Sequence, residues 1–365
     1  MEIPATAGEI TAEWLDAALE HSGSSQGKRV VSLRQEPLTE LGMTGTLLRL
    51  HVDYEGGAGD APATLIAKLP DPESTGYEMA MAMGFYACEG RFFDELADDC
   101  GVSVPHVHYN GIDEEAKRFL LLLEDLAPAR TVALPASCSV DDARCALGEL
   151  AKLHARYWDS PKLQQLEWMR SLADPAFGGF VRDLSRSQWP VLMEQQGKTM
   201  PAMPEALRRA GDRYMESIDD LWSIQSPQTV NHGDFHVGNM IFEARGGDCP
   251  LAIIDWQLMV RRGALPDVSY ALAFSLEAND RRDHEDALLA DYHRALVEHG
   301  VTGFSLDDCR YFYKLGVLAQ FALMALHMMN VANASDRDLH ITRELHRRAH
   351  AALLETGALD VLSDV

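Results

Sequence analysis

One short stretch of the chain holds an aspartate, an asparagine five residues later and a second aspartate. They are Asp234, Asn239 and Asp255, within residues 230–257. A hydroxyl that attacks the terminal phosphate of a nucleotide needs a carboxylate to accept or orient its proton. It also needs oxygen ligands that hold magnesium against the phosphates. These three side chains could do both, so the stretch predicts phosphoryl transfer from a hairpin.

Two histidines in the same stretch leave a second chemistry open. His232, Asp234 and His236 alternate in sequence, and alternate residues of a strand point to one face, as the ligands of a metal-dependent hydrolase would. Imidazole favours zinc, whereas the amide and carboxylate oxygens of Asn239 and Asp255 favour magnesium. We therefore expect the histidines to support the loop, and a metal-dependent hydrolase is the alternative.

Composition and charge narrow the class of protein. The chain has 365 residues, of which 47% are hydrophobic, which favours a folded protein of two domains or lobes. Its 56 acidic and 32 basic side chains give a formal net charge of −24, which argues against nucleic acid or an anionic membrane as a partner. Six cysteines without a CxxC pair indicate neither a zinc knuckle nor a thioredoxin-like site.

The sequence shows neither a secretory signal pattern nor an apolar run long enough for a membrane helix. The N-terminus lacks a basic and then apolar signal pattern. The longest uncharged apolar run, between Lys314 and Asn330, is shorter than the about 20 residues of a membrane helix. We therefore expect a buried core helix there, no membrane insertion and a cytoplasmic protein.

The pattern of apolar residues changes along the chain. A capped helix begins after Thr11, strands are expected at 46–54, 64–69 and 118–124, and one long helix at 77–99. Beyond Leu126 most segments have helical periodicity, beginning with 141–158. This predicts an α+β fold with a β-rich N-lobe at 1–126 and a mainly helical C-lobe at 127–365, joined by a hinge at 124–128. The catalytic hairpin, 230–257, would belong to the C-lobe.

Several motifs together resemble a known group of enzymes. The stretch HGDFHVGN followed by IDWQ is similar to the aminoglycoside phosphotransferase and choline kinase group, within the protein-kinase-like fold. TLIAKLP, FYACEGRFFDEL, FLLLLEDL and LGELAKLHARYW most resemble the ecdysteroid-kinase-like (CHK) branch and its bacterial relatives. The resemblance covers nearly the whole chain. It implies a two-lobed kinase-like fold with ATP in the cleft, and an enzyme that transfers the ATP γ-phosphate to a hydroxyl of a small molecule.

The resemblance also assigns roles in the C-lobe. It implies that Asp234 is the catalytic base, and that Asn239 and Asp255 are the Mg²⁺ ligands. Asp267 resembles the acid that follows the metal motif, and we expect it to brace the catalytic loop through backbone hydrogen bonds.

In the N-lobe, the resemblance implies a nucleotide site. Lys68 would contact the α and β phosphates and Glu89 would orient it, in preference to Glu78 on the same predicted helix. The backbone of Glu124 and Leu126 would pair with adenine. The phosphate-covering loop would include Gly42, Thr44, Gly45 and Thr46.

The acceptor is not specified by any motif. Segments 163–225 and 277–343 are expected to line its pocket, and Trp168, Trp189 and Trp222 are either core residues or walls of that pocket. Antibiotic, sugar, choline-like, steroid and lipid-like alcohols all stay open, as does the oligomeric state. A further alternative is a pseudokinase that binds nucleotide without consuming it.

Overall fold

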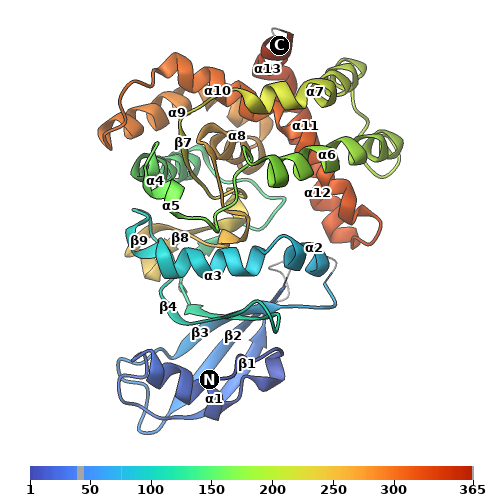
Figure 1. Cartoon of the computed structure of the whole chain (residues 1–365). Helices are drawn as coiled ribbons and strands as arrows, with labels where there is room; N and C mark the ends of the chain where they lie inside the picture. Colours follow the sequence, from blue (N-terminus) through green and yellow to red (C-terminus); the bar gives the residue numbers. More distant parts are fainter. Residues whose placement is uncertain (39–44, 75, 364–365) are drawn as a thin grey trace. The chain divides into compact units, whose positions relative to one another are not determined.

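The computed structural model describes residues 1–38, 45–74 and 76–363 (Figure 1). Its contacts divide the chain into two compact units. The N-terminal unit contains Met1–Asp99, Ser103–Ala129 and Ala244–Gly246, and the C-terminal unit contains Cys100–Val102, Arg130–Glu243 and Gly247–Val365. The lobe boundary placed after Leu126 stays a prediction. The combination of a β-rich first part and a helical second part confirms the α+β fold class.

The N-terminal unit is built on a five-stranded sheet with the order β1-β2-β3-β5-β4. The neighbouring strands pair antiparallel. Strands consecutive in the chain form the pairs β1–β2, β2–β3 and β4–β5, whereas β3 pairs with β5 across residues 71–117. The predicted strands at 46–54, 64–69 and 118–124 are confirmed as β2, β3 and β5. The strands are β1 (Val30–Pro37), β2 (Gly45–Tyr54), β3 (Thr64–Pro70), β4 (Val107–Asp113) and β5 (Arg118–Glu124).

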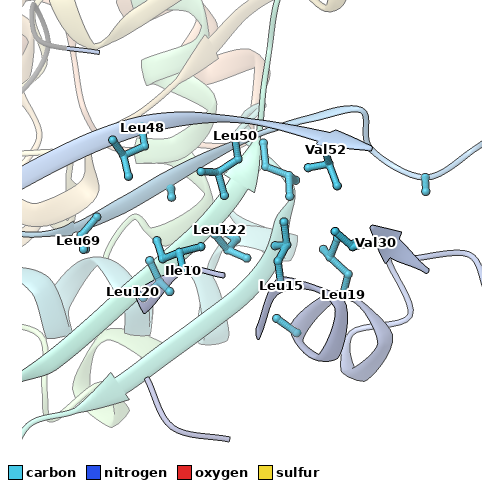
Figure 2. Close-up of a cluster of buried hydrophobic side chains, with 14 of the residues drawn as sticks. Ile10, Leu15, Leu19, Val30, Leu48, Leu50, Val52, Leu69, Leu120 and Leu122 are labelled. Atoms are coloured by element: carbon cyan, nitrogen blue, oxygen red, sulfur yellow. The ribbon is translucent and has the colours of Figure 1, made fainter. Parts of the chain in front are cut away.

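Alternation of side chains gives this sheet two apolar faces. Leu48, Leu50 and Val52 of β2 lie in one cluster with Leu120 and Leu122 of β5, as Figure 2 shows. Helix α1 (Ala12–His21) covers this face with Leu15 and Leu19 (Figure 2), and the Thr11 side chain caps its N-terminus by accepting from the Trp14 N–H. On β5, Phe119 instead joins a cluster with Tyr86 and Ala87. The sheet is thus held between helices.

The single helix expected at 77–99 was wrong. The chain forms α2 (Tyr77–Ala82), α3 (Phe85–Glu95) and the short 3-10 turn η2 (Ala97–Asp99). The break between the first two falls at Gly84, whose φ of 66° is left-handed and is tolerated by glycine without a steric penalty. Apolar spacing continues across the break, so periodicity alone did not reveal it.

The C-terminal unit is mainly helical. Ser139, Ser305 and Ser335 begin three of its helices with reciprocal capping boxes, because each is followed three residues later by an aspartate. The helices are α4 (Val140–Tyr157), α5 (Lys162–Gln165), α6 (Pro175–Gln195), α7 (Glu205–Ser223), α8 (Leu265–Ser275), α9 (Ala278–Glu298), α10 (Leu306–Leu318), α11 (Gln320–Val331), α12 (Asp336–Glu355) and α13 (Ala358–Ser363).

The stretch expected to be one hairpin belongs to two sheets. Strand β7 (Gln228–Asn231) pairs with β10 (Val260–Gly263), whereas β8 (Met240–Ala244) lies between β6 (Arg130–Thr131) and β9 (Cys249–Ile253). Residues 232–236 form a loop and not a strand. The hairpin prediction therefore holds for β8 and β9 alone, because β7 pairs with β10, which follows Asp255 in the chain.

The apolar segment near residue 320 is longer than its sequence predicted. Helices α10 and α11 follow each other with only Ala319 between them, so Leu306–Val331 counts as 26 residues of helix, and an 18-residue window within it has a mean hydropathy of 1.3. By length and composition this segment passes as a membrane span. The expectation that it is too short was wrong. A core helix of a soluble protein passes the same test, and 56% of the apolar window is buried. Packing of α10 on α8 and of α11 on α6 favours the core helix. A cytoplasmic location stays a prediction.

Candidate active site

Asp234 lies in the loop after β7 and is held from several sides. The Tyr270 hydroxyl, on α8, donates to Asp234 Oδ1 at 2.7 Å. The Asn239 amide donates to the Asp234 carbonyl at 2.9 Å and to Oδ2 at 3.2 Å, and His236 Nε2 lies 3.4 Å from Oδ2. The carboxylate still keeps 24% of its side-chain surface exposed. It is thus oriented by three side chains and open to a reacting molecule.

Asn239 and Asp255 stand at the two ends of the pair β8 and β9. Asn239 precedes β8, Asp255 follows β9, and the Ile254 N–H donates to the Asn239 carbonyl at 3.1 Å, which ties the two ends together. Because the Asn239 amide nitrogen is committed to Asp234, its Oδ1 is the atom left to bind a cation. Asp255 adopts φ 66°, a strained value for a residue with a side chain. A carboxylate and an amide oxygen form a hard donor set that suits magnesium.

The histidines support the loop, as the sequence predicted. His232 is fully buried, its Nε2 donates to the Ile254 carbonyl at 2.9 Å, and its Nδ1 accepts from the Asp234 N–H at 3.3 Å. His236 Nδ1 accepts from the Gly238 N–H at 3.0 Å. With both ring nitrogens of His232 engaged by backbone, this residue cannot ligate a metal, and the metal-dependent hydrolase built on His232, Asp234 and His236 loses its first ligand.

Asp267 braces the loop that carries Asp234, and this bracing confirms its expected role. The carboxylate is 1% exposed and accepts from the His232 N–H at 2.6 Å and from the Gly233 N–H at 3.0 Å. His154 Nε2 lies 3.5 Å from the same carboxylate. Gly233 has φ 86°, and a Cβ there would meet the Leu258 carbonyl at 2.1 Å. The close approach of two backbone segments therefore requires glycine at this position.

The charges of the site are tuned by these contacts. Burial opposes ionisation of Asp234, but the charge and hydrogen bond of His236 and the Tyr270 hydroxyl hold its pKa well below the usual range. Burial lowers the pKa of His232. Burial also acts to lower the pKa of His236, but the Asp234 charge outweighs it and raises that pKa. Asp234 is therefore ionised throughout the neutral range.

Lys68 and Glu89 form a buried ion pair in the N-terminal unit. Lys68 Nζ on β3 lies 2.9 Å from Oε1 and 2.8 Å from Oε2 of Glu89 on α3. Their side chains are 12% and 3% exposed. The structure therefore brings together the two residues that the sequence paired, and it leaves Glu78, on α2, exposed.

The predicted phosphate-covering loop is only partly described. Gly42 and Thr44 lie outside the described residues, whereas Gly45 and Thr46 begin β2 opposite Pro70 and Leu69 of β3. A Cβ on Gly45 would meet the Leu69 carbonyl at 2.6 Å, so a close strand contact already explains this glycine.

The expected hinge residues are fixed by an arginine that the sequence did not single out. Arg245 Nε donates to Glu124 Oε1 at 2.7 Å, and its Nη2 donates to Oε2 at 2.8 Å. The Glu124 N–H donates to the His106 carbonyl, and the Leu126 carbonyl accepts from the Arg245 N–H. The Glu124 N–H is thus already engaged, the Leu126 carbonyl keeps a second lone pair, and the pairing of this backbone with adenine stays a prediction. The Leu126 N–H is the more suitable group.

The predictions from the sequence did not include two residues of the site, Tyr270 and Arg245. Tyr270 stands three residues after Asp267, one turn further along α8, so helical spacing from Asp267 could have identified it. Arg245 is separated from Glu124 by more than a hundred positions, and no local pattern signals their contact. Trp189, one of the three tryptophans considered for the acceptor pocket, is a 5% exposed core residue that donates to Asp212.

The comparisons place the chain among kinase-like proteins. Residues 42–301, well over half of the chain, match the ecdysteroid kinase-like family, and the chain belongs to that family. A homoserine kinase of Zymomonas mobilis subsp. mobilis is 27% identical over 128 residues, which are 34% of this chain and 37% of that relative. The chain thus spans a little over a third of the length of this curated relative.

Solved structures share the fold at low sequence identity. Choline kinase from Cryptosporidium parvum Iowa II superposes with a TM-score of 0.57 and 8% identity, over 91% of each chain. Amicoumacin kinase, solved in complex with AMP-PNP, Ca²⁺ and Ami, superposes with a TM-score of 0.51 and 13% identity, over 94% of this chain and 96% of its own. These likenesses establish the protein-kinase-like fold.

Proposed function

We propose that this protein is an ATP- and Mg²⁺-dependent phosphotransferase that transfers the γ-phosphate of ATP to a hydroxyl of a small molecule. The observation that carries the proposal is the contact of Asn239 with Asp234. One amide group binds the carboxylate through its nitrogen and leaves its oxygen for a cation. A base and a metal ligand are thereby held in fixed relation, which phosphoryl transfer requires.

Asp234 would receive the acceptor hydroxyl. Its pKa is held below the usual range by His236 and Tyr270, so it is a weak base that orients the hydroxyl and takes its proton late. This suits phosphoryl transfer, whose loose transition state demands little proton abstraction before the phosphorus–oxygen bond changes. Asn239 and Asp255 would hold magnesium, which neutralises the charge on the phosphates when bound.

Lys68 would contribute the phosphate contact of the N-terminal unit. Its ammonium is kept in one position by Glu89, so little side-chain entropy would be lost when phosphate arrives. The Leu126 N–H would donate a hydrogen bond to the adenine ring of ATP.

The relatives support a small alcohol as the acceptor. The curated relative is a homoserine kinase, and the solved neighbours are a choline kinase and an amicoumacin kinase bound to AMP-PNP and Ca²⁺. Each is named as a kinase of a small molecule, and none of them fixes the acceptor of this chain.

A screen of ATP consumption tests the proposal. The purified protein would be incubated with Mg-ATP and panels of amino alcohols, sugars, macrocyclic antibiotics and sterols, with ADP release measured and phosphorylated product identified by mass spectrometry. We expect product with at least one class, and none in EDTA or with Asp234→Asn. Tight Mg-ATP binding without product from any class would favour the pseudokinase instead.

A further inference from the structure

The C-terminal unit contains a cavity that none of the predicted catalytic, metal-binding or nucleotide-binding residues lines, although Trp222, one of the tryptophans considered for the acceptor pocket, does line it. Its volume is about 140 Å³. Its walls are largely aromatic and aliphatic, and they come from the ends of α4, α7, α8 and α10 and from the strands β7 and β10. The aromatic side chains are Trp158, Trp222, Phe304 and Phe312.

These aromatic rings brace one another, so the cavity is preformed. The rings of Trp158 and Phe304 meet edge to face with centroids 4.9 Å apart, and Phe304 stacks on Phe312 at 6.0 Å. The Trp222 indole N–H donates to the Tyr214 hydroxyl at 3.0 Å, while the Arg182 guanidinium lies over its ring at 5.7 Å. Little ordering is left for a ligand to impose, which favours binding.

The strand register separates this cavity from Asp234. Gln228 and Gly263, which line the cavity, pair at one end of the two-stranded sheet, and Asn231 and Val260 pair at the other. The loop that carries Asp234 continues from the Asn231 end. Three residues of strand cover roughly 10 Å, so Gln228 and Gly263 lie about that far along the strands from the end that leads to Asp234.

Arg262 gives the cavity its chemical character. Among the residues that the structure describes, it is the charged side chain that lines the cavity, and no aspartate or glutamate lines it. Arg262 Nε donates to Asn231 Oδ1 at 3.3 Å, and no ion pair joins its guanidinium to a carboxylate in the described parts of the chain. Burial lowers the pKa of Arg262, and the charge of Asp267, which acts in the opposite direction, does not outweigh it. Its remaining N–H groups can receive an anion.

We propose that this cavity is a binding site for a small aromatic carboxylate, with the ring between Trp158, Trp222 and Phe304 and the carboxylate on Arg262. Arginine favours a carboxylate because its planar fork can donate two parallel hydrogen bonds. The size fits, because an apolar cavity of about 150 Å³ accommodates benzene. The ligand is therefore one ring with one acidic group.

Benzoate is the probe, and titration calorimetry with tryptophan fluorescence is the measurement. At physiological salt, wild-type protein should bind benzoate with a dissociation constant on the order of 1 mM or below, given the few atoms of the ligand. Benzamide, which has the ring without the charge, and acetate, which has the charge without the ring, should each bind at least about tenfold more weakly.

Arg262→Gln should weaken benzoate binding by roughly 10- to 100-fold, the size of one charge-assisted contact. Arg261→Gln is the matched control, because Arg261 is the adjacent residue of β10 but donates to the Leu163 carbonyl and to Gln164, outside the cavity lining. It should bind as wild type. Ala319→Leu, which keeps Arg262 and fills the cavity, should also abolish binding.

Three results would overturn the proposal. The first is equal affinity of the wild-type protein for benzoate and benzamide. The second is benzoate binding that is unchanged in Arg262→Gln or in folded Ala319→Leu. The third is the absence of saturable benzoate binding to folded wild-type protein. Melting curves of each variant establish folding. Because the readout is binding without ATP or acceptor, it is independent of the proposed phosphotransferase activity.

Discussion

The Tyr270 hydroxyl donates a 2.7 Å hydrogen bond to Asp234 Oδ1. The same ring stacks on His236 with an interplanar angle of 25° and meets Phe274 edge to face. Tyr270 therefore holds the carboxylate and one of its other partners at once, from a helix whose first turn also supplies Asp267. The first turns of α8 therefore support the loop that carries Asp234.

Tyr270→Phe should lower kcat by about tenfold, because it removes a hydrogen bond to a charged group worth about 1.5–3 kcal/mol, part of which water replaces. The ring contacts stay. The KM for ATP should be nearly unchanged, and the acid limb of the pH–rate profile should move upward because Asp234 loses a contact that lowers its pKa. Tyr311→Phe, at a 41% exposed position, is the control and should behave as wild type. Steady-state kinetics measured across pH test this prediction. An unaltered pH–rate profile would show that Tyr270 does not lower the pKa of Asp234.

Asp234→Asn should reduce turnover by about 10²- to 10⁴-fold, the usual size of general-base assistance. Nucleotide affinity should change little, since Asp234 is not among the predicted metal or nucleotide contacts. Single-turnover rates and the dissociation constant of Mg-ATP measure the two effects separately. Asp248→Asn, at an exposed position in the loop between β8 and β9, is the control. Turnover close to that of the control would show that Asp234 is not the base.

The sequence revealed the parts of this site that are close in the chain. The spacing of Asp234, Asn239 and Asp255 is short enough to be read directly, and the sheet alternation of Leu48, Leu50 and Val52 identified β2. Partners that depend on distant pairing could not be read. The contact of Arg245 with Glu124 and the pairing of β7 with β10 join segments that have no common periodic pattern. The break at Gly84 was missed because a left-handed residue leaves the apolar spacing intact.

Glu89→Gln should destabilise the N-terminal unit by about 3 kcal/mol, because it leaves the buried Lys68 ammonium without its counter-ion. The KM for ATP should rise as Lys68 loses its fixed position. Urea denaturation and ATP kinetics provide the two measurements. Glu78→Gln is the matched control, since this acid is exposed on α2 and should change neither quantity. Equal behaviour of the two variants would contradict the pairing.

Glu124 should give the protein a stability that depends on pH. Burial opposes its ionisation, but hydrogen bonds from Arg245 and from the His106 N–H lower its pKa. A lowered pKa in the folded state means that the stabilisation is present above the unfolded value of about 4.3 and is lost as pH falls through the folded pKa. Arg245→Gln should therefore cost about 1–2 kcal/mol at pH 7, and its difference from wild type should shrink in acid.

The free energy of unfolding at pH 7 and at pH 3 measures this effect. Arg34→Gln is the control, because Arg34 keeps 63% of its side chain exposed and its pair with Glu36 should contribute little. A cost of Arg245→Gln that is the same at both pH values would mean that the arginine stabilises by packing and not through the Glu124 charge.

Mg-ATP should stabilise the fold by roughly 2.7 kcal/mol at a hundred times its dissociation constant, since a ligand that binds only the folded state shifts unfolding by mass action. Asn239→Leu should remove most of the part that depends on magnesium, because the oxygen left over from the contact with Asp234 is lost. Melting temperatures with ATP alone, Mg²⁺ alone and both together isolate that part. Asn279→Leu, on the surface at the start of α9, is the control. If the melting temperature did not change with Mg-ATP but rose with Zn²⁺, the metal-dependent hydrolase would become the better-supported function, although both ring nitrogens of His232 are engaged by backbone.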